Sequence, residues 1–229
     1  MQRLAVYYAP PVTHPLWDFG CRWLGRDPET DQRLAPPVMP ALDTQTLRDI
    51  TASPRHYGFH GTLKAPFELA PDHTEAAFRE RLARFATGRA CFTLPPLTLS
   101  SLGGFLALML ERSCPDLDAL AEACVVELDS FRAPLDPADL TRRRQTNLSL
   151  RQEDYLQRWG YPYVLEEFRF HLTLSDWLEA PLREQVRAAL LPLVEPLCRM
   201  PLTVDAVCLF TQPDRHTPFR LVERFPLGQ

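Results

Sequence analysis

The sequence lacks the long apolar stretch that a membrane-spanning helix needs, because its 229 residues contain no run of about 18 apolar residues. The N-terminal segment also lacks the apolar core of a secretory signal peptide, since Pro10, Pro11 and Pro15 interrupt it. Positive charge is not in excess: the formal net charge is -4, so no global field attracts long nucleic acid or an anionic membrane. We therefore expect a cytoplasmic protein with no membrane partner, in which any phosphate binding is local.

Sequence motifs of several enzyme classes are also absent. No G-x-S-x-G elbow, P-loop or dinucleotide-binding glycine motif occurs, so serine hydrolase and nucleoside triphosphate chemistries find no support. The six cysteines form no C-x-x-C pair, and we expect buried free thiols instead of disulfides or a zinc site. His56 and His60 have the spacing of helical metal ligands, but Gly58 lies between them and no carboxylate completes a site. We expect no metal and no cofactor.

Apolar residues make up 45% of the sequence, which is enough for a substantial core. In the first half, alternation of apolar and polar residues over Tyr57–Lys64 predicts a strand, and Asp72 is the expected N-cap of a helix. Gly103-Gly104 then marks the turn of a hairpin. Further strands are expected at residues 3–8, 91–99 and 105–110 and helices at residues 15–25 and 116–131, while residues 142–157 form a helix or an ordered loop.

The second half repeats this order of strand, helix and hairpin. Phe168–Ser175 alternates more cleanly than the first strand. Pro181 begins a helix that Pro192 kinks or ends. Two strands follow, at residues 202–210 and 219–225.

The two repeats, about residues 56–110 and 166–226, indicate an internal duplication. We therefore predict a single bilobal domain over residues 1–229. Its fold class is α+β, with two antiparallel sheets, flanked by helices, around a central cleft.

Each repeat carries a histidine followed two positions later by a threonine, His60-Gly-Thr62 and His171-Leu-Thr173. Histidine, whose ordinary pKa is about 6.5, gives or takes a proton near neutrality, and phosphodiester cleavage needs one group for each task. In a strand the threonine emerges on the same face, so its hydroxyl can donate to a phosphate oxygen. Gly61 suggests close approach by a ligand or backbone. One such pair occurs often by chance, but two in equivalent strands predict convergence around one phosphate.

With these motifs, extended to His60-Gly-Thr62-Leu63 and His171-Leu-Thr173-Leu174, the chain resembles the 2H phosphoesterases, a superfamily that includes 2'-5' RNA ligase-like proteins. The segments Tyr57-Gly-Phe-His-Gly-Thr-Leu-Lys-Ala-Pro-Phe67 and Trp159-Gly-Tyr-Pro-Tyr163 look most similar to a DUF1045-like branch, often encoded beside phosphonate-utilisation genes. The resemblance implies a duplicated α+β fold with both motifs in a central cleft. It also implies a metal-independent cyclic phosphodiesterase for a 2',3'-cyclic nucleotide or ribose cyclic phosphate, or a 2'-5' RNA ligase acting on RNA ends.

The mechanism that the resemblance implies is general acid and base catalysis. One neutral histidine activates water, the other, protonated, assists the leaving oxygen, and the threonines stabilise charge on the phosphate oxygens. We assign the base to His171 and the acid to His60, although the pseudosymmetry permits the reverse, and we expect a bell-shaped dependence of rate on pH. The alternative class is a sensor that binds nucleotide or phosphate without turnover. Either way, we expect a monomer and a small phosphorylated ligand.

Three basic residues are further candidates for binding the substrate. Lys64 and Arg169 project from the same strand faces as the motif residues, although a solvated charge at a strand end explains them equally well. Arg143, in the basic run of residues 142–144, could hold a second phosphate or a nucleotide tail, but such runs are usually solvated.

Tyr161 is the fourth candidate. Together with Trp159 and Tyr163 it could stack on a base or sugar at the mouth of the cleft. Packing within the core or a loop is the alternative, and the favoured one.

Overall fold

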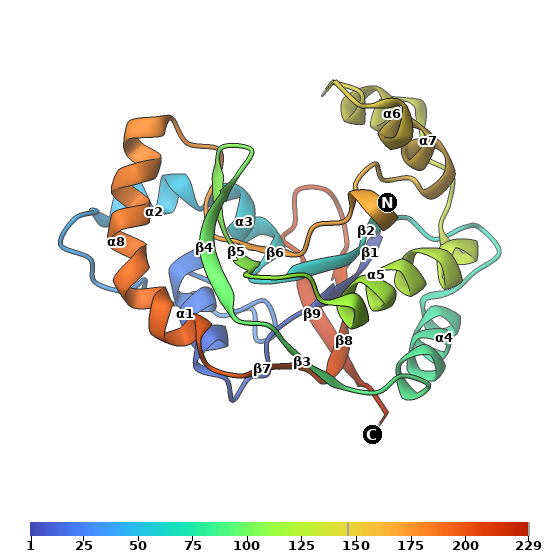
Figure 1. Cartoon of the computed structure of the whole chain (residues 1–229). Helices are drawn as coiled ribbons and strands as arrows, with labels where there is room; N and C mark the ends of the chain where they lie inside the picture. Colours follow the sequence, from blue (N-terminus) through green and yellow to red (C-terminus); the bar gives the residue numbers. More distant parts are fainter. Residues whose placement is uncertain (146, 229) are drawn as a thin grey trace.

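The structure is a computed structural model that describes residues 1–145 and 147–228 and combines helices with antiparallel sheet (Figure 1). Its strands are β1 (Arg3–Tyr8), β2 (Gly61–Phe67), β3 (Phe92–Leu94), β4 (Leu97–Leu102), β5 (Phe105–Leu110), β6 (His171–Thr173), β7 (Leu202–Val204), β8 (Ala206–Gln212) and β9 (Arg220–Pro226). Its helices are α1 (Pro15–Leu24), α2 (Thr44–Ile50), α3 (Ala52–Tyr57), α4 (Glu75–Thr87), α5 (Pro115–Glu127), α6 (Pro137–Arg143), α7 (Leu150–Trp159) and α8 (Ala180–Cys198), with 3-10 turns η1 (Asp129–Phe131) and η2 (Leu165–Glu167). The predicted α+β class is confirmed.

The larger of the two sheets has seven strands in the order β4-β5-β6-β2-β1-β8-β9, and β3 pairs with β7 in a two-stranded ribbon. The sequence predicted one sheet for each lobe instead. The lobes share a sheet because the two motif-bearing strands, β2 and β6, pair with each other through Gly61 and Leu172. This link is a single residue pair. The sheet therefore consists of two halves, β4-β5-β6 and β2-β1-β8-β9, that meet at the motifs.

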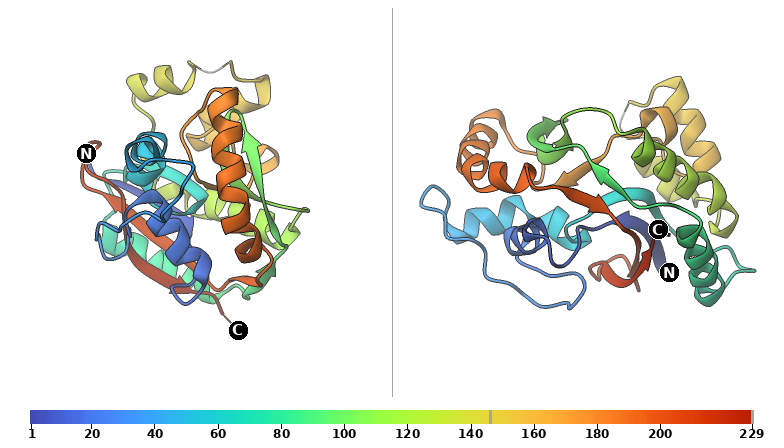
Figure 2. Two further views of the ribbon diagram at one scale, coloured as in Figure 1. Left: turned by 90° about the vertical axis from the view of Figure 1, so that its left-hand side faces the viewer. Right: turned by 60° about the horizontal axis from the view of Figure 1, so that its bottom comes forward.

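Each half of the sheet combines elements from both halves of the sequence. The early hairpin β4-β5 pairs with the late strand β6, and the late helix α8 packs on β4 and β5. Conversely, the late hairpin β8-β9 lies beside β1 and β2, and the early helix α4 packs on β9. Figures 1 and 2 show α8 beside β4 at one end of the molecule and α4 with α5 at the other. The hairpins are thus exchanged between the two sequence halves.

Two helix boundaries differ from the sequence predictions. Tyr57 ends helix α3, and β2 begins only at Gly61, so His60 lies directly before the strand and not within it. The N-cap of α4 is Thr74, not Asp72: its extended backbone lets the side chain accept a hydrogen bond of 3.2 Å from the backbone amide of Ala77. Threonine and aspartate are both good N-caps, so the choice between two positions so close together depends on backbone conformation.

Helix α8 continues through Pro192 and Pro196, where the sequence predicted a kink or an end. Both prolines are exposed, so the carbonyl groups that lose an amide partner face water. The opposite face of the helix is held by side chains buried at every fourth position, namely Val186, Leu190, Val194 and Cys198.

The core lies between the sheet and the helices and includes Trp23, Phe59 and Phe210, each almost fully buried. All six cysteines are free thiols; five are buried as expected, and Cys91 is exposed. Within the described residues, no helix combines the length and the apolar character needed to cross a bilayer.

Candidate active site

The pairing of β2 with β6 brings the two His-x-Thr motifs together. Gly61 opposes Leu172 in an antiparallel register, so one residue further in each direction His60 opposes Thr173 and Thr62 opposes His171. Residues directly opposite each other share a face of the sheet. The four motif residues are half-buried on that face, whereas Gly61 is buried. Diagonal neighbours in such a pair lie roughly 7–8 Å apart, which is close enough for both imidazoles to address one phosphate.

The two imidazole rings have the same orientation relative to the backbone. The Nδ1 of His60 donates to the carbonyl oxygen of Gly58 over 2.9 Å, and the Nδ1 of His171 donates to that of Arg169 over 2.7 Å. A carbonyl only accepts, so each Nδ1 carries the hydrogen and each Nε2 is left for chemistry. The Oγ1 of Thr62 lies 3.3 Å from the Nε2 of His60. Gly58 has φ +82, which permits the turn that aims its carbonyl at His60.

Burial controls the charge of both histidines. Desolvation lowers the pKa of His60 to about 4; the hydrogen bond to Gly58 offsets only part of this effect, and His171 adds repulsion. The Tyr7 ring covers His60 at 3.8 Å between centroids and 22° between planes. Desolvation also lowers the pKa of His171, whose nearest aromatic neighbour, Phe105, lies farther away at 5.7 Å. Both rings are therefore mostly neutral at pH 7.

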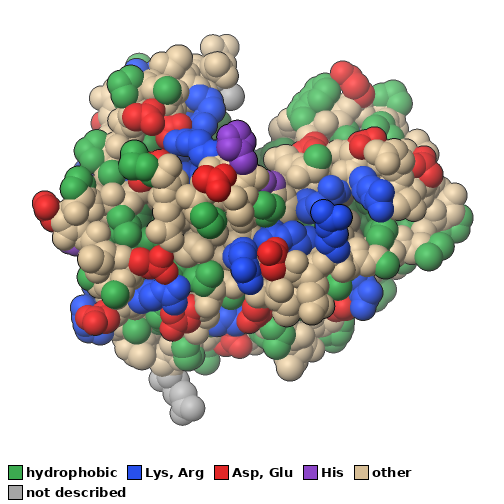
Figure 3. Space-filling view, turned by 180° about the vertical axis from the view of Figure 1, so that it is seen from behind, with side chains coloured by type: hydrophobic (Ala, Val, Ile, Leu, Met, Phe, Trp, Pro, Cys, Tyr) green, Lys and Arg blue, Asp and Glu red, His purple; other side chains and the backbone are tan. Residues whose placement is uncertain are grey.

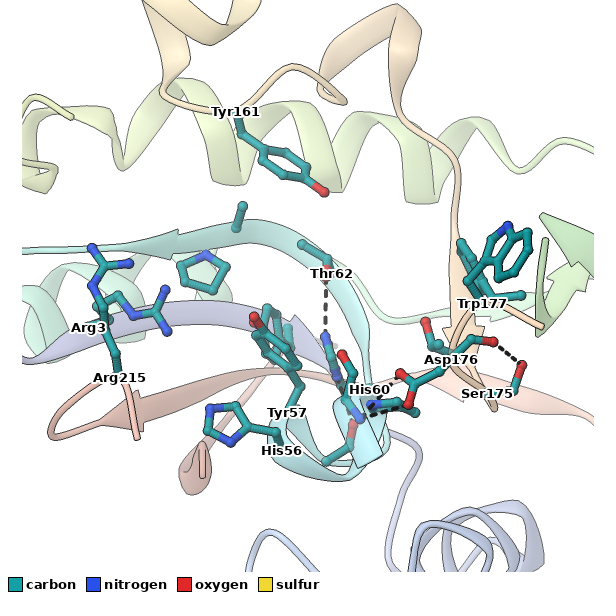
Figure 4. Close-up of a pocket in the computed structure, with 18 of the residues that line it drawn as sticks. Arg3, His56, Tyr57, His60, Thr62, Tyr161, Ser175, Asp176, Trp177 and Arg215 are labelled. Atoms are coloured by element: carbon teal, nitrogen blue, oxygen red, sulfur yellow. Dashed lines mark hydrogen bonds between the residues drawn. The ribbon is translucent and has the colours of Figure 1, made fainter. Parts of the chain in front are cut away.

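A cavity of about 650 Å³ lies over the motif face, with Thr62 and His60 near its middle (Figure 4). Arg3 and Arg215 lie at one end of it and Trp177 at the other. Its volume is in the range of small-molecule sites. On the surface the molecule is notched between its two halves, and histidine and basic side chains gather along one wall of the notch (Figure 3).

A second cavity of about 490 Å³ adjoins the first and brings in the other motif. It is lined by His171, while Thr173 lines the first cavity and Thr62 lines both. Tyr161 also borders both spaces. The strand register thus brings the four motif residues to two adjoining cavities, with His60 at the first and His171 at the second.

Lys64 does not reach either of these cavities, in contrast to the sequence prediction. It is almost fully buried, and its Nζ donates to the carbonyl oxygen of Val125 at 3.1 Å and to Asp129 at 3.2 Å. The strict alternation that placed Lys64 beside Thr62 is interrupted by a register shift between β1 and β2, which turns the lysine away. Lys64 is a structural ion-pair partner.

The other sequence candidates lie at the cavities to different degrees. Arg143 lines the first cavity, where its guanidinium lies 5.0 Å from the centre of the Tyr161 ring. Arg169 is exposed and lines the second cavity together with Tyr163. Trp159 lies outside both and instead packs against the guanidinium of Arg158 at 4.7 Å.

Gly61 has a different role from the predicted close approach of a ligand or backbone. A Cβ atom there would lie 2.4 Å from the Phe170 ring, so the glycine makes room for an aromatic side chain. Phe170 lies beneath the motif face and packs against Tyr8 at 5.8 Å.

Sequence reasoning missed several residues at the first cavity. Arg3 and Arg215 come from opposite ends of the chain, and no sequence signal connects them. Tyr7 lies in the predicted strand of residues 3–8, on the same face as Arg3. The sequence does not show that this strand pairs with β2, which is what brings Tyr7 to His60. The described residues contain no cluster of three or more histidine, cysteine or acidic side chains suited to a metal ion.

Comparisons with known proteins identify a family and two long relatives. Residues 62–220 match the family described as "Protein of unknown function (DUF1045)". A protein of Janthinobacterium sp. (strain Marseille) named "Ribose 1,5-bisphosphate phosphokinase PhnN" is 34% identical over 232 residues, which cover 100% of this chain and 51% of the relative. A protein of the same name from Laribacter hongkongensis (strain HLHK9) is 36% identical over 221 residues, 96% of this chain and 50% of the relative. The chain thus spans about half the length of these relatives.

A solved structure described as "Crystal structure of phosphoesterase" aligns over 100% of both chains, with 14% sequence identity and a TM-score of 0.39. A TM-score this low does not establish a common fold.

Proposed function

The chain belongs to the DUF1045 family, the branch indicated by the residues around its two motifs, and on that premise we propose that it is a metal-independent phosphoesterase that opens a cyclic phosphodiester. The observation that carries this proposal is the antiparallel pairing of β2 with β6, which sets two His-x-Thr motifs against each other at two adjoining cavities. Two imidazoles, each held through its Nδ1 by a backbone carbonyl, offer their Nε2 atoms as the base and the acid that the reaction needs.

In the proposed reaction a water oxygen forms a bond to phosphorus while one P–O bond of the ring breaks. The Nε2 of one histidine takes a proton from the water, and the Nε2 of the other gives a proton to the departing sugar oxygen. The product is a phosphate monoester beside a free hydroxyl, and the two imidazoles return to their starting states by exchanging one proton with solvent. The hydroxyls of Thr62 and Thr173 donate to the non-bridging oxygens, where negative charge increases in the transition state.

We assign the base to His60 and the acid to His171, which reverses the assignment made from the sequence. A pKa of about 4 keeps His60 neutral and ready to accept a proton at neutral pH. His171 lacks a stacked aromatic cover and is the easier of the two to protonate when a substrate phosphate brings negative charge beside it.

For the substrate we propose a ribose cyclic phosphate or a 2',3'-cyclic nucleotide. The name shared by the two relatives refers to a phosphorylated ribose. Their phosphokinase activity is not carried over, because this sequence has no P-loop. The net charge of -4 disfavours long RNA as a partner.

The test is a panel of ribose cyclic phosphates and 2',3'-cyclic nucleotides, assayed with and without a chelator. We expect ring opening to continue in the presence of the chelator. Its rate should fall at least about 1000-fold in both His60→Ala and His171→Ala. His73→Ala, which removes a histidine outside both cavities, is the matched control and should retain full activity.

Three outcomes would contradict the proposal. Binding without product formation would identify a sensor. Loss of activity on chelation would refute the metal-independent mechanism. Joining of RNA ends in preference to hydrolysis would identify a 2'-5' RNA ligase.

A further inference from the structure

Four arginines line the first cavity: Arg3, Arg142, Arg143 and Arg215, which we call the arginine cluster. They come from three separate segments, namely β1, helix α6 and the turn between β8 and β9. The repulsion of Arg3 by Arg215 and Arg142 contributes, after burial, to lowering the pKa of Arg3. All four side chains therefore border one space, where they can act on the same ligand.

Carboxylates contact two members of the cluster. Arg142 and Arg215 share the carboxylate of Asp139, each at 2.7 Å, and Arg215 also lies 3.7 Å from Glu68. Arg3 is bound to a neutral group instead, its Nε donating to the Oε1 of Gln212 at 2.7 Å. The buried charge of Arg3, which a neutral amide holds, costs free energy that a bound anion would offset.

Gln212 holds Arg3 in a fixed orientation. The Nε2 of Gln212 donates to the Nε2 of His56 and to the carbonyl oxygen of Thr217, both at 2.7 Å, so the Oε1 must face the arginine. Gln212 is fully buried, and Arg3 is 9% exposed. A charge fixed in this way at a cavity is preorganised to bind an anion.

Helix α6 also depends on this charge arrangement. None of its side chains is buried, so its position rests on polar contacts such as that of Asp139 with Arg215 and on the contact of Arg143 with the Tyr161 ring. An anion bound by the arginine cluster would therefore connect α6 to β1 and to the β8–β9 turn.

We propose that the arginine cluster binds a second phosphate of the substrate, which is a small sugar carrying a terminal phosphate monoester in addition to the cyclic ester at the two histidines. This inference rests on the proposed function. Tyr57 lies between His60 and the Arg3 and Arg215 pair, where its ring forms a wall for the sugar (Figure 4). Arginine suits this task because its planar group donates two parallel hydrogen bonds to one phosphate.

Two properties favour a small ligand over a polynucleotide. Arg3 and Arg215 lie together at one end of a single cavity of about 650 Å³, which Arg142 and Arg143 also line, whereas proteins that bind single strands line a long groove with positive charge. A terminal monoester also carries a charge of about -1.5 to -2 at pH 7, more than the single charge of a diester in a nucleic acid backbone.

The test compares cytidine 2',3'-cyclic phosphate with the same compound bearing a 5'-phosphate. We expect kcat/KM to be at least about tenfold higher for the 5'-phosphorylated compound, since hydrogen bonds between charged groups have effects of this size. Arg215→Met and Arg142→Met should each lower the ratio of the two kcat/KM values about tenfold. Arg220→Met, on an exposed arginine that lies outside both cavities, should leave the ratio unchanged.

A binding measurement separates this inference from the proposed function. Ribose 5-phosphate should bind the wild-type protein, bind Arg215→Met at least about tenfold more weakly, and slow hydrogen exchange in residues 137–143. If neither cyclic compound is opened but ribose 5-phosphate binds in this way, the proposed function fails and the anion site stands. Equal kcat/KM for both compounds, or ribose 5-phosphate binding that Arg215→Met does not change, would overturn the second-phosphate site. A strong preference for an oligonucleotide with a 2',3'-cyclic end would overturn the small-substrate class.

Discussion

Acidification should destabilise the protein through His60, because its imidazole is buried in the neutral form. The ordinary pKa of histidine is about 6.5, and burial lowers that of His60 to about 4. Between these two values the unfolded chain binds a proton that the folded protein does not. Stability present above pH 6.5 is therefore lost progressively as the pH falls toward 4.

The size of this effect follows from the shift. Each unit of pKa difference corresponds to about 1.4 kcal/mol, so full desolvation would make His60 cost roughly 3 kcal/mol at pH 4. The ring is half-buried and lines a cavity, so solvent screening reduces this value. We expect a contribution of about 2 kcal/mol between pH 7 and pH 4.5.

Urea unfolding of the wild type and His60→Gln at pH 7 and pH 4.5, followed by circular dichroism, measures this contribution. Glutamine is polar and does not titrate, and all other acidic and basic groups are common to both proteins. The free energy of unfolding of the wild type should therefore fall about 2 kcal/mol further than that of the variant. Equal losses in the two proteins would show that the pKa of His60 is ordinary, and would remove the reason for assigning it as the base.

Three further predictions concern the same region. An aryl oxide needs no proton to leave, so His171→Ala should keep a much larger fraction of the wild-type rate on an aryl diester than on a cyclic ribose phosphate. His60→Ala should lose activity on both substrates. The opposite pattern in steady-state assays would reverse the two roles. Gly61→Ala should lower the free energy of unfolding by about 1–3 kcal/mol, because the new methyl group would lie 2.4 Å from the Phe170 ring. Lys64→Met should lower the free energy of unfolding by about 1–3 kcal/mol, because the carbonyl oxygen of Val125 loses its donor while Asp129 keeps its ion pair with Arg132. KM should stay unchanged, since the ammonium group of Lys64 pairs inside the protein; a raised KM would show that Lys64 binds the substrate.

The local structure that follows from residue type and periodicity was predictable. The strand of residues 3–8 and the helix that begins at Pro15 occur where the sequence predicted them, because β-branched and aromatic residues favour the first and a proline at the start favours the second. The position of His60 beside Thr62 also followed, since residues two apart in a strand share a face. These inferences need no information about neighbouring strands.

The features that depend on neighbouring strands were not predictable. Lys64 turns away because of a register shift against β1, and a shift of this kind is a property of two strands together. Arg3 reaches the cavity beside Arg215 because β1 pairs with β8, where Arg3 opposes Gln212. Residues more than 200 positions apart become neighbours only through this pairing, and the sequence holds no local signal for it.

Strand β1 has no counterpart in the second half of the chain, and it accounts for the difference between two otherwise equivalent motifs. Each motif strand has one partner on its outer side: β1 beside β2, and β5 beside β6. From β1, Tyr7 stacks directly on His60, whereas the aromatic neighbour of His171 is more distant. The same strand supplies Arg3 to the cavity. The added strand therefore gives the two histidines different aromatic surroundings and contributes Arg3 to the arginine cluster on one side. Under the proposed function, a nearly symmetric pair of motifs would in this way act on an asymmetric substrate.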